Sequence, residues 1–311
     1  MPKIDFGVML RQQKIDFSRI KDTAQLCDDF GYHSVWLYDH ILGMGGIEVD
    51  IYEAWTLMSS LCSVTKDIKH GTMVLCNSFR PPALLAKMSA TLDVISGGRL
   101  EFAIGAGWFE PEYKSYGYDF PDTKTRIEQL SESVQIIRQM WTEEKPNFKG
   151  KYYSISDAFC NPKPVQSPHP PIQIGGSGEK YLLRVVAEHA DEWNCPATAA
   201  EQFDTKYRAL ENHCRDIGRD VNEIALSQQT VCIIADNDKE LEDKISFGKK
   251  RYGFFGDIES FGIIGKPDRC IQKIKENYEK GIKKYTIFFA DIMNHDTLNF
   301  FAREVMSEFR D

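Results

Sequence analysis

Strand-like and helix-like patterns alternate along the whole 311-residue chain. Short apolar segments are followed by segments whose apolar residues recur at three- and four-residue spacing. The eight predicted strands cover residues 4–10, 34–38, 70–76, 100–104, 172–174, 192–195, 224–235 and 285–290. Eight strands that alternate with helices favour an α/β fold of the closed (β/α)8, or TIM, barrel type. An open doubly wound sheet is the second possibility.

The helix patterns indicate how the chain is organised into domains. The predicted helices cover residues 20–30, 54–64, 82–95, 125–141, 179–189, 203–217 and 267–280. Thr125 and Glu128 have capping-box spacing, which predicts that a helix begins there. Residues 143–171, with a small hairpin expected at 148–153, and residues 247–265 interrupt the alternation. Because the alternation resumes in phase after each, we interpret both as insertions at the C-terminal mouth of a single domain covering residues 1–311.

Composition narrows the class of protein. The chain has 46 acidic and 38 basic residues, a net charge of −8 and no basic run, which disfavours a nucleic-acid or anionic-membrane surface. No apolar run approaches the length needed to cross a bilayer, and the short, charged N-terminus is unlike a signal peptide, so we expect a cytoplasmic protein. The eight cysteines lack C-x-x-C spacing and the seven histidines form no metal-binding motif, so we expect reduced thiols and no metal.

Two predicted strands end in glycine turns. The first continues into Gly105-Ala106-Gly107, and the second into Gly175-Gly176-Ser177-Gly178. Missing side chains at a strand end let a flat ligand lie against the backbone, although such glycines also occur in tight turns that bind nothing. The second turn precedes a helix, whose free N–H groups favour a phosphate, with Ser177 as an additional donor. Two turns of this kind predict one shared cofactor-binding face.

Further candidates follow other strand ends. Asp39 and His40 come directly after a predicted strand, and the imidazole of His40 is a candidate general acid or base near neutral pH. The alternative is a histidine that is only hydrogen-bonded within the protein. Asp39 is a candidate to orient His40 or to accept a bond from a cofactor ring. Trp108 and Glu112 follow the first glycine turn. Trp108 is a candidate wall beside a flat ring system, and core packing explains the tryptophan equally well.

Two longer motifs carry a family resemblance. Residues 96–117 read SGGRLEFAIGAGWFEPEYKSYG, and residues 162–178 read PKPVQSPHPPIQIGGSG. Together they resemble the luciferase-like monooxygenase superfamily, and within it the oxidoreductases that use the deazaflavin coenzyme F420. The resemblance implies a (β/α)8 barrel, usually a homodimer, that transfers a hydride between F420 and a small organic substrate. The alternatives are an FMN-dependent monooxygenase using reduced flavin and oxygen, and a flavin-binding barrel without activity.

The resemblance also implies roles for particular residues. Asp39 and His40 match an Asp-His pair beside the cofactor ring, with His40 as the proton donor. Met73 and Val74 match a non-proline cis peptide that bulges against the ring. The remaining matches are turns that hold the cofactor, at Ala106, Gly107, Gly175, Gly176 and Ser177. Our candidate donors to its anionic tail are Arg80, Lys163, Lys180 and Arg184. Trp108 and Met44 replace a glutamate and a tryptophan of the F420-dependent sugar-phosphate dehydrogenases, so the resemblance does not extend to that activity.

Overall fold

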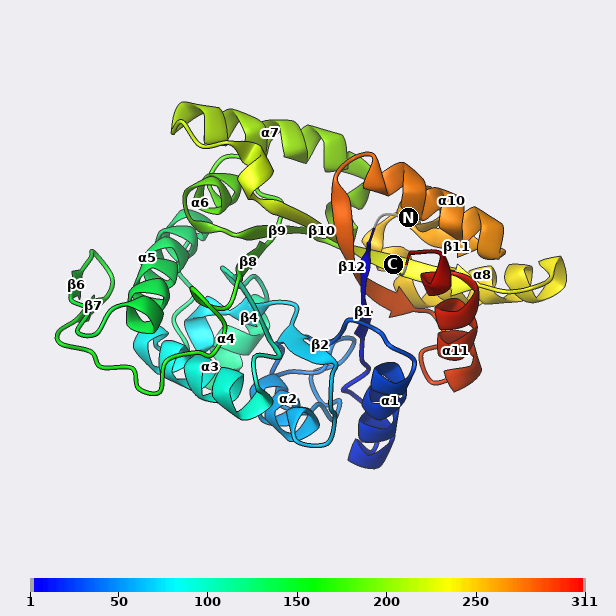
Figure 1. Cartoon of the computed structure of the whole chain (residues 1–311), viewed down its shortest axis with the longest axis horizontal. Coiled ribbons are helices and arrows are strands. Elements are labelled where there is room, and N and C mark those ends of the chain that lie inside the picture. The colour runs from blue at the N-terminus through cyan, green and yellow to red at the C-terminus, as the bar shows by residue number, and fades with distance from the viewer. Residues whose placement is uncertain (1–2, 310–311) are drawn as a thin grey trace.

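A closed barrel of eight parallel strands forms the centre of the computed structural model, which describes residues 3–309. The barrel strands are β1 (Asp5–Met9), β2 (Ser34–Leu37), β3 (Lys69–Thr72), β5 (Leu100–Gly105), β8 (Ile172–Gly175), β9 (Glu192–Cys195), β10 (Ala225–Ile234) and β12 (Ile282–Phe289). They pair in this order, and β12 returns to β1, which closes the ring (Figure 1). The predicted barrel is confirmed, and the open doubly wound sheet is wrong.

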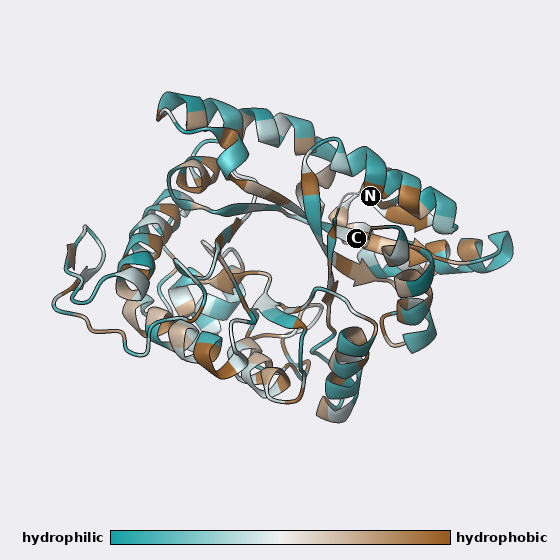
Figure 2. Ribbon diagram, in the orientation of Figure 1, coloured by the Kyte–Doolittle hydropathy of each residue, from teal (hydrophilic) through white to brown (hydrophobic). Residues whose placement is uncertain are grey.

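Helices surround the barrel (Figure 1). They are α1 (Phe17–Asp29), α2 (Ala54–Cys62), α3 (Pro82–Ser96), α5 (Thr123–Thr142), α6 (Leu182–His189), α7 (Phe203–Asp216), α8 (Asp238–Tyr252), α10 (Pro267–Tyr278) and α11 (His295–Glu304). Brown and teal residues alternate along these helices in Figure 2, as expected when one face packs on the strands and the other faces water. Among residues 3–309, no helix is long and apolar enough to cross a membrane.

Shorter elements lie in the loops between strands and helices. The short strands and helices are β4 (Leu75–Cys76), α4 (Glu110–Tyr116), β6 (Phe148–Lys149), β7 (Ser154–Ile155), α9 (Ile258–Phe261) and β11 (Ile263–Gly265). The 3-10 turns are η1 (Asn77–Phe79), η2 (Ala197–Gln202), η3 (Val221–Glu223), η4 (Gly253–Phe255) and η5 (Met306–Phe309). Strands β6 and β7 pair antiparallel, which confirms the hairpin expected in the first insertion.

Several elements differ from the sequence-based expectation: α1 begins three residues earlier, α6 begins three residues later, β12 begins three residues earlier, and α11 was not predicted. Three further differences have clear physical reasons. Helix α5 begins earlier than predicted, because the Asp122 carboxylate caps it by accepting a 2.9 Å hydrogen bond from the Thr125 N–H. Helix α8 was not predicted, because only Gly248 and Tyr252 of its residues are buried and no apolar stripe marks it. The strand expected at residues 70–76 is divided into β3 and β4 by a cis peptide bond between Met73 and Val74.

A tryptophan fills the middle of the barrel. Trp36 of β2 is fully buried, and its ring lies against Gly7 of β1 and Gly71 of β3, its two neighbouring strands. A Cβ atom at Gly71 would lie 2.4 Å from Cζ3 of Trp36, and one at Gly7 would lie 2.4 Å from its Nε1. Both glycines are therefore required by close packing of the indole.

We expect the substitution Gly71→Ala to lower the free energy of unfolding by about 1–3 kcal/mol, because the added methyl group overpacks the Trp36 ring. Gly253→Ala is the matched control, since a Cβ there meets nothing within 4 Å and its φ of −59° suits alanine. Urea denaturation measures both variants. Equal stability of Gly71→Ala and the control would contradict this packing.

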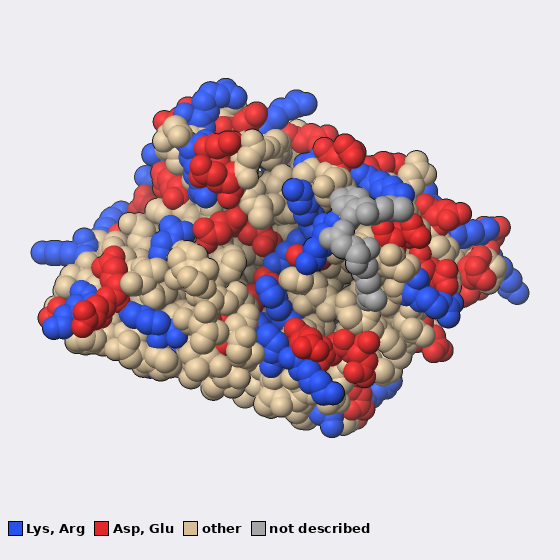
Figure 3. Space-filling view, in the orientation of Figure 1, with Lys and Arg blue, Asp and Glu red and all other residues tan. Residues whose placement is uncertain are grey.

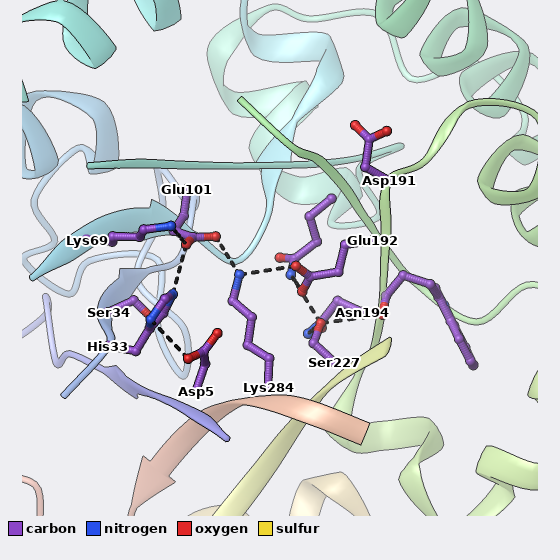
Figure 4. A network of polar contacts seen from close by, with 12 residues as sticks. Asp5, His33, Ser34, Lys69, Glu101, Asp191, Glu192, Asn194, Ser227 and Lys284 are labelled. Atoms are coloured by element: carbon purple, nitrogen blue, oxygen red, sulfur yellow. Dashed lines mark hydrogen bonds and ion pairs between the residues drawn. The ribbon is translucent and has the colours of Figure 1, made fainter. Parts of the chain in front are cut away.

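Charged side chains occupy the N-terminal end of the barrel interior (Figure 4). The Lys284 ammonium group lies 2.5 Å from a carboxylate oxygen of Glu101 and 3.1 Å from one of Glu192. Glu101 also contacts Lys69 at 3.1 Å and His33 at 3.1 Å. Burial raises the pKa of Glu101, but the neighbouring cations, above all Lys284, outweigh burial and hold that pKa well below its ordinary value. Charge pairing thus makes this polar floor compatible with burial.

Charges of both signs are interspersed on the face of the molecule shown in Figure 3. Basic and acidic side chains alternate there, and no large area of one sign is visible on this face. This face therefore shows no uniformly charged area of the kind that marks a surface for a strongly charged partner.

Candidate functional site

The two predicted glycine turns lie next to each other at the C-terminal end of the barrel. Strands β5 and β8 are paired, with Ile104 opposite Ile174, so Gly105 and Gly175 end neighbouring strands. A Cβ atom at Gly105 would lie 3.3 Å from the carbonyl oxygen of Gly175. The two turns therefore share one face, as predicted, at the mouth where active sites of such barrels are built. Cofactor binding at this face stays a prediction.

The Met73–Val74 bulge projects between these turns. The peptide bond is cis, as the family resemblance implied. A Cβ at Gly105 would lie 2.7 Å from Cγ2 of Val74, and one at Gly175 would lie 2.6 Å from Cγ1. The space left by the two glycines is therefore filled by Val74, and is not open backbone against which a ligand lies directly. A ligand at this mouth meets the bulge itself.

His40 and Glu112 form a hydrogen-bonded pair at the rim. Nδ1 of His40 lies 2.9 Å from Oε2 of Glu112, and the other carboxylate oxygen accepts the N–H groups of Ile41 and Leu42 at 2.7 and 3.0 Å. Glu112 is only 2% exposed. Because an ionised carboxylate only accepts hydrogen bonds, Nδ1 of His40 carries the proton in this pair. Nε2 is then the ring nitrogen that can exchange a proton with a ligand.

Trp108 lies beside this pair. Its ring meets the His40 ring edge to face, with centroids 5.8 Å apart, and it also contacts Phe109. The Trp108 side chain is 64% exposed, so it is not a core residue. Of the two readings of Trp108, a wall beside the mouth therefore agrees with the structure, and core packing does not.

Asp39 has partners of its own, separate from those of His40. Its carboxylate accepts two hydrogen bonds from the Arg80 guanidinium, at 2.8 and 3.0 Å, and one from the Cys76 N–H at 2.8 Å. Arg80 also contacts Glu53 at 2.5 Å. Asp39 is 5% exposed. This bidentate ion pair fixes the loop after β2 to the segment after β4 and so supports the backbone that carries His40.

The turn after β5 is held by the buried Tyr113. A Cβ at Gly107, where φ is +74°, would lie 1.9 Å from the Tyr113 hydroxyl oxygen, which itself lies 3.2 Å from Sγ of Cys76. Burial raises the pKa of Tyr113 above its ordinary value and that of Cys76 to about 11, so both groups are neutral near pH 7. Half-buried Ala106 packs against the main core. These contacts fix the path of the backbone beside Trp108.

The second turn precedes α6 and carries the hydroxyl group of Ser177. Gly176 has φ of +135°, and its carbonyl oxygen accepts a 2.8 Å hydrogen bond from the indole of Trp193. Ser177 is half-buried, and within residues 3–309 its hydroxyl has no hydrogen-bond partner. The backbone of the turn is thus fixed from behind, while Ser177 remains available to a ligand.

The four candidate donors to the anionic tail of the cofactor differ in whether their side chains already have polar partners in the protein. Lys163 donates to the main-chain carbonyl groups of Met140 and Glu143. Arg184 pairs with Glu188 at 2.9 Å, and Arg80 is held by Asp39. Lys180 is exposed and lies over the ring of Tyr181, with 5.0 Å from Nζ to the centroid. Of these four, only Lys180 therefore has no polar partner among residues 3–309.

The opposite side of the mouth contains residues to which the sequence analysis assigned no role, although it placed the insertion at residues 247–265 at this mouth. Tyr38 and Phe288 pack on the cluster that includes Trp36 and Met73, and the Phe288 ring contacts Tyr252 and Phe255 with centroids 5.6 and 5.1 Å apart. Tyr252 ends α8 and Phe255 lies in η4. The aromatic run YGFF at 252–255 was the available signal, but its placement depends on α8, which the pattern did not reveal.

Gln12 was also missed. Its side-chain amide is fully buried and bonds the Tyr38 N–H and carbonyl groups and the Tyr52 carbonyl, each at 2.9 Å. This amide ties the segment after β1 to the segment that begins at Tyr38, two residues before His40. A buried glutamine gives no periodic signal, so only the folded chain shows this role.

Comparison with known proteins identifies the family to which the sequence is similar. A sequence profile described as luciferase-like monooxygenase matches residues 3–256. An F420-dependent glucose-6-phosphate dehydrogenase from Amycolatopsis mediterranei (strain U-32) is 34% identical over 175 residues, covering 54% of this chain and 49% of that protein. An FMNH(2)-dependent dimethylsulfone monooxygenase from Pseudomonas putida is 28% identical over 224 residues, covering 70% of this chain and 59% of that protein. The chain thus spans roughly half to three fifths of these curated relatives.

The solved structures show the same fold. An F420-dependent secondary alcohol dehydrogenase, determined in complex with an F420-acetone adduct, aligns with a TM-score of 0.82 and 21% sequence identity. The alignment covers 99% of this chain and 100% of that one. At this identity the likeness concerns the barrel and its connections, and relatives with both deazaflavin and flavin names share it.

Proposed function

The chain belongs to the luciferase-like monooxygenase family, and from that premise we propose that it transfers a hydride between coenzyme F420 and a small organic substrate. The two curated relatives described above are both oxidoreductases, a dehydrogenase and a monooxygenase. The observation that carries the finer proposal is the His40–Glu112 pair at the rim of the mouth. It provides a proton donor and acceptor where a carbonyl or alcohol must exchange a proton as the hydride moves.

The residues at the mouth fit a flat ring with a phosphate tail. The Met73–Val74 bulge supplies an apolar surface for one ring face, in front of Gly105 and Gly175. Ser177 has an unpartnered hydroxyl within the described chain, beside the start of α6, where free N–H groups favour a phosphate. We therefore propose that the bulge supports the ring, and that the turn at residues 175–177 holds the phosphate.

The protein's own contribution is orientation and proton transfer. The reduced deazaflavin, when bound, supplies the hydride. Glu112 fixes the tautomer of His40 by accepting from Nδ1, which directs Nε2 to the proton exchange. When the imidazole is protonated, the buried Glu112 carboxylate stabilises its positive charge. Trp108 and Phe109 flank the His40 ring and limit access of water to it.

A flavin mononucleotide monooxygenase is the second candidate function. The similarity to the FMNH(2)-dependent dimethylsulfone monooxygenase favours it, since that match covers more of this chain than the F420-dependent relative does. The same bulge and turn suit the isoalloxazine ring and phosphate of FMN. The two functions differ in their need for oxygen, because only the monooxygenase consumes it.

Titration of the apoprotein with F420 and with FMN tests the proposal, because the two cofactors have distinct absorbance and fluorescence. We expect F420 to bind at least about tenfold more tightly than FMN, equivalent to about 1.4 kcal/mol. Oxygen uptake with reduced FMN is the parallel measurement. Preferential FMN binding with substrate-dependent oxygen consumption would select the monooxygenase instead.

A further inference from the structure

Two arginines at the mouth lack acidic partners. Arg11 follows β1, and Arg251 lies in the last turn of α8; both side chains are half-buried. Nε of Arg11 donates to the Gln13 carbonyl at 3.0 Å, and the Arg251 guanidinium lies 5.4 Å from the centre of the Tyr252 ring. No carboxylate oxygen of residues 3–309 lies within 4.0 Å of either guanidinium. Arg80 at the same mouth differs, because it is neutralised by Asp39 and Glu53.

The charges of both arginines act on the same pair of phenols. Burial raises the pKa of Tyr38 to about 12 and also raises that of Tyr252, while the charges of Arg11 and Arg251 act on both hydroxyl groups in the opposite direction. The two phenols are therefore neutral near pH 7 and do not balance the cations. Asp291 also faces Tyr252, but its carboxylate is already bonded by Lys244 and Thr297.

The strand order separates this location from the phosphate turn. Strand β1, which leads to Arg11, and strand β8, which leads to Ser177, lie on opposite sides of the eight-strand ring. Tyr38 lies between the arginines and the proposed proton donor, because its ring is 6.0 Å from that of His40. A ligand that reaches from His40 over Tyr38 therefore ends near the two guanidinium groups, away from the cofactor phosphate.

We propose that Arg11 and Arg251 form an anion subsite that binds a carboxylate or phosphate group of the substrate, an inference that rests on the proposed function for the position of the reacting end. Guanidinium groups match the planar oxygens of such anions by paired hydrogen bonds. The rings of Tyr252, Phe255 and Phe288 beside the subsite provide apolar contact for the body of the ligand. The substrate class is thus an organic acid or phosphate ester with an apolar body.

Calorimetric titration with benzoate, phenyl phosphate and neutral benzamide tests the subsite, on the apoprotein and on the cofactor-loaded protein. We expect at least one of the two anions to bind about tenfold or more tightly than benzamide, and the stronger anion identifies the preferred group. Arg11→Gln and Arg251→Gln should each remove that advantage and leave benzamide binding unchanged. Arg208→Gln is the matched control, since this exposed arginine on α7 has no ion pair among residues 3–309.

Equal binding of benzamide and both anions would overturn the subsite. The subsite would also be overturned if Arg11→Gln and Arg251→Gln kept both the thermal midpoint and the anion affinity of the parent protein. If the same two substitutions instead weaken cofactor binding about tenfold, the arginines serve the cofactor and the proposal is also wrong. The titrations require no turnover, so failure of the proposed reaction is recognised separately, by the cofactor titration.

Discussion

Replacement of His40 by alanine is expected to lower the turnover number by about two to four orders of magnitude, the usual contribution of a positioned acid or base. Cofactor affinity should fall only modestly, because the Met73–Val74 bulge and the turn at residues 175–177 are untouched. Glu112→Gln keeps the shape of the side chain and removes its charge, so we expect a smaller loss of turnover at nearly unchanged cofactor affinity. Steady-state kinetics and cofactor titration measure the two effects independently.

His213→Ala is the control for this experiment. His213 lies on α7, where its ring contacts the Glu179 carbonyl at 2.7 Å, and among residues 3–309 no hydrogen bond, ion pair or ring contact joins it to His40, Trp108 or Glu112. Turnover of the control should match that of the parent protein. Unchanged turnover in His40→Ala would remove the proton-transfer role, and the His40–Glu112 bond would then be a structural contact.

The barrel could be predicted because each strand carries its signal locally. Strand β9 matches its predicted residues, strands β2, β5 and β8 differ by one residue at one end, and β1 is one residue shorter at each end. Helix α8 could not be predicted, since its sequence DKELEDKISFGKKRY is charged on nearly every side and its burial depends on contacts made after folding. Local periodicity reports the face that packs on a core, and α8 buries very little.

The sequence predicted which residues lie at the candidate site better than it predicted the contacts among them. His40 and Glu112 were both expected at the mouth. They are 72 residues apart in sequence, so no local pattern predicts the hydrogen bond between them. The glycines at 105 and 175 were correctly expected at one face, while their reason, the Val74 side chain, required three separate segments to be placed together. The cis bond itself came from family resemblance, because periodicity across residues 70–76 predicts an unbroken strand.

Replacement of Lys284 by methionine is expected to lower the free energy of unfolding by about 3–5 kcal/mol, because it leaves two buried carboxylates without their shared cation. Lys284 has a side chain of 12% exposure between Glu101 and Glu192, which are each 9% exposed. Lys114→Met is the matched control: the Lys114–Glu110 pair is largely exposed, and we expect a change below about 1 kcal/mol. Urea denaturation near neutral pH measures both.

Lowering the pH should reduce the difference in the free energy of unfolding between Lys284→Met and the parent protein. The folded pKa of Glu101 lies below its unfolded value, so the associated stabilisation is complete above about pH 4.3, the ordinary carboxyl pKa, and disappears as the pH falls through the folded pKa. In Lys284→Met, burial raises the Glu101 pKa against weaker opposition from Lys69 and His33, so protonation relieves the buried charge. The parent therefore loses more stability than the variant between pH 7 and pH 3. A difference that stays constant over this range would mean that lost packing of the lysine chain, rather than unpaired charge, causes the destabilisation.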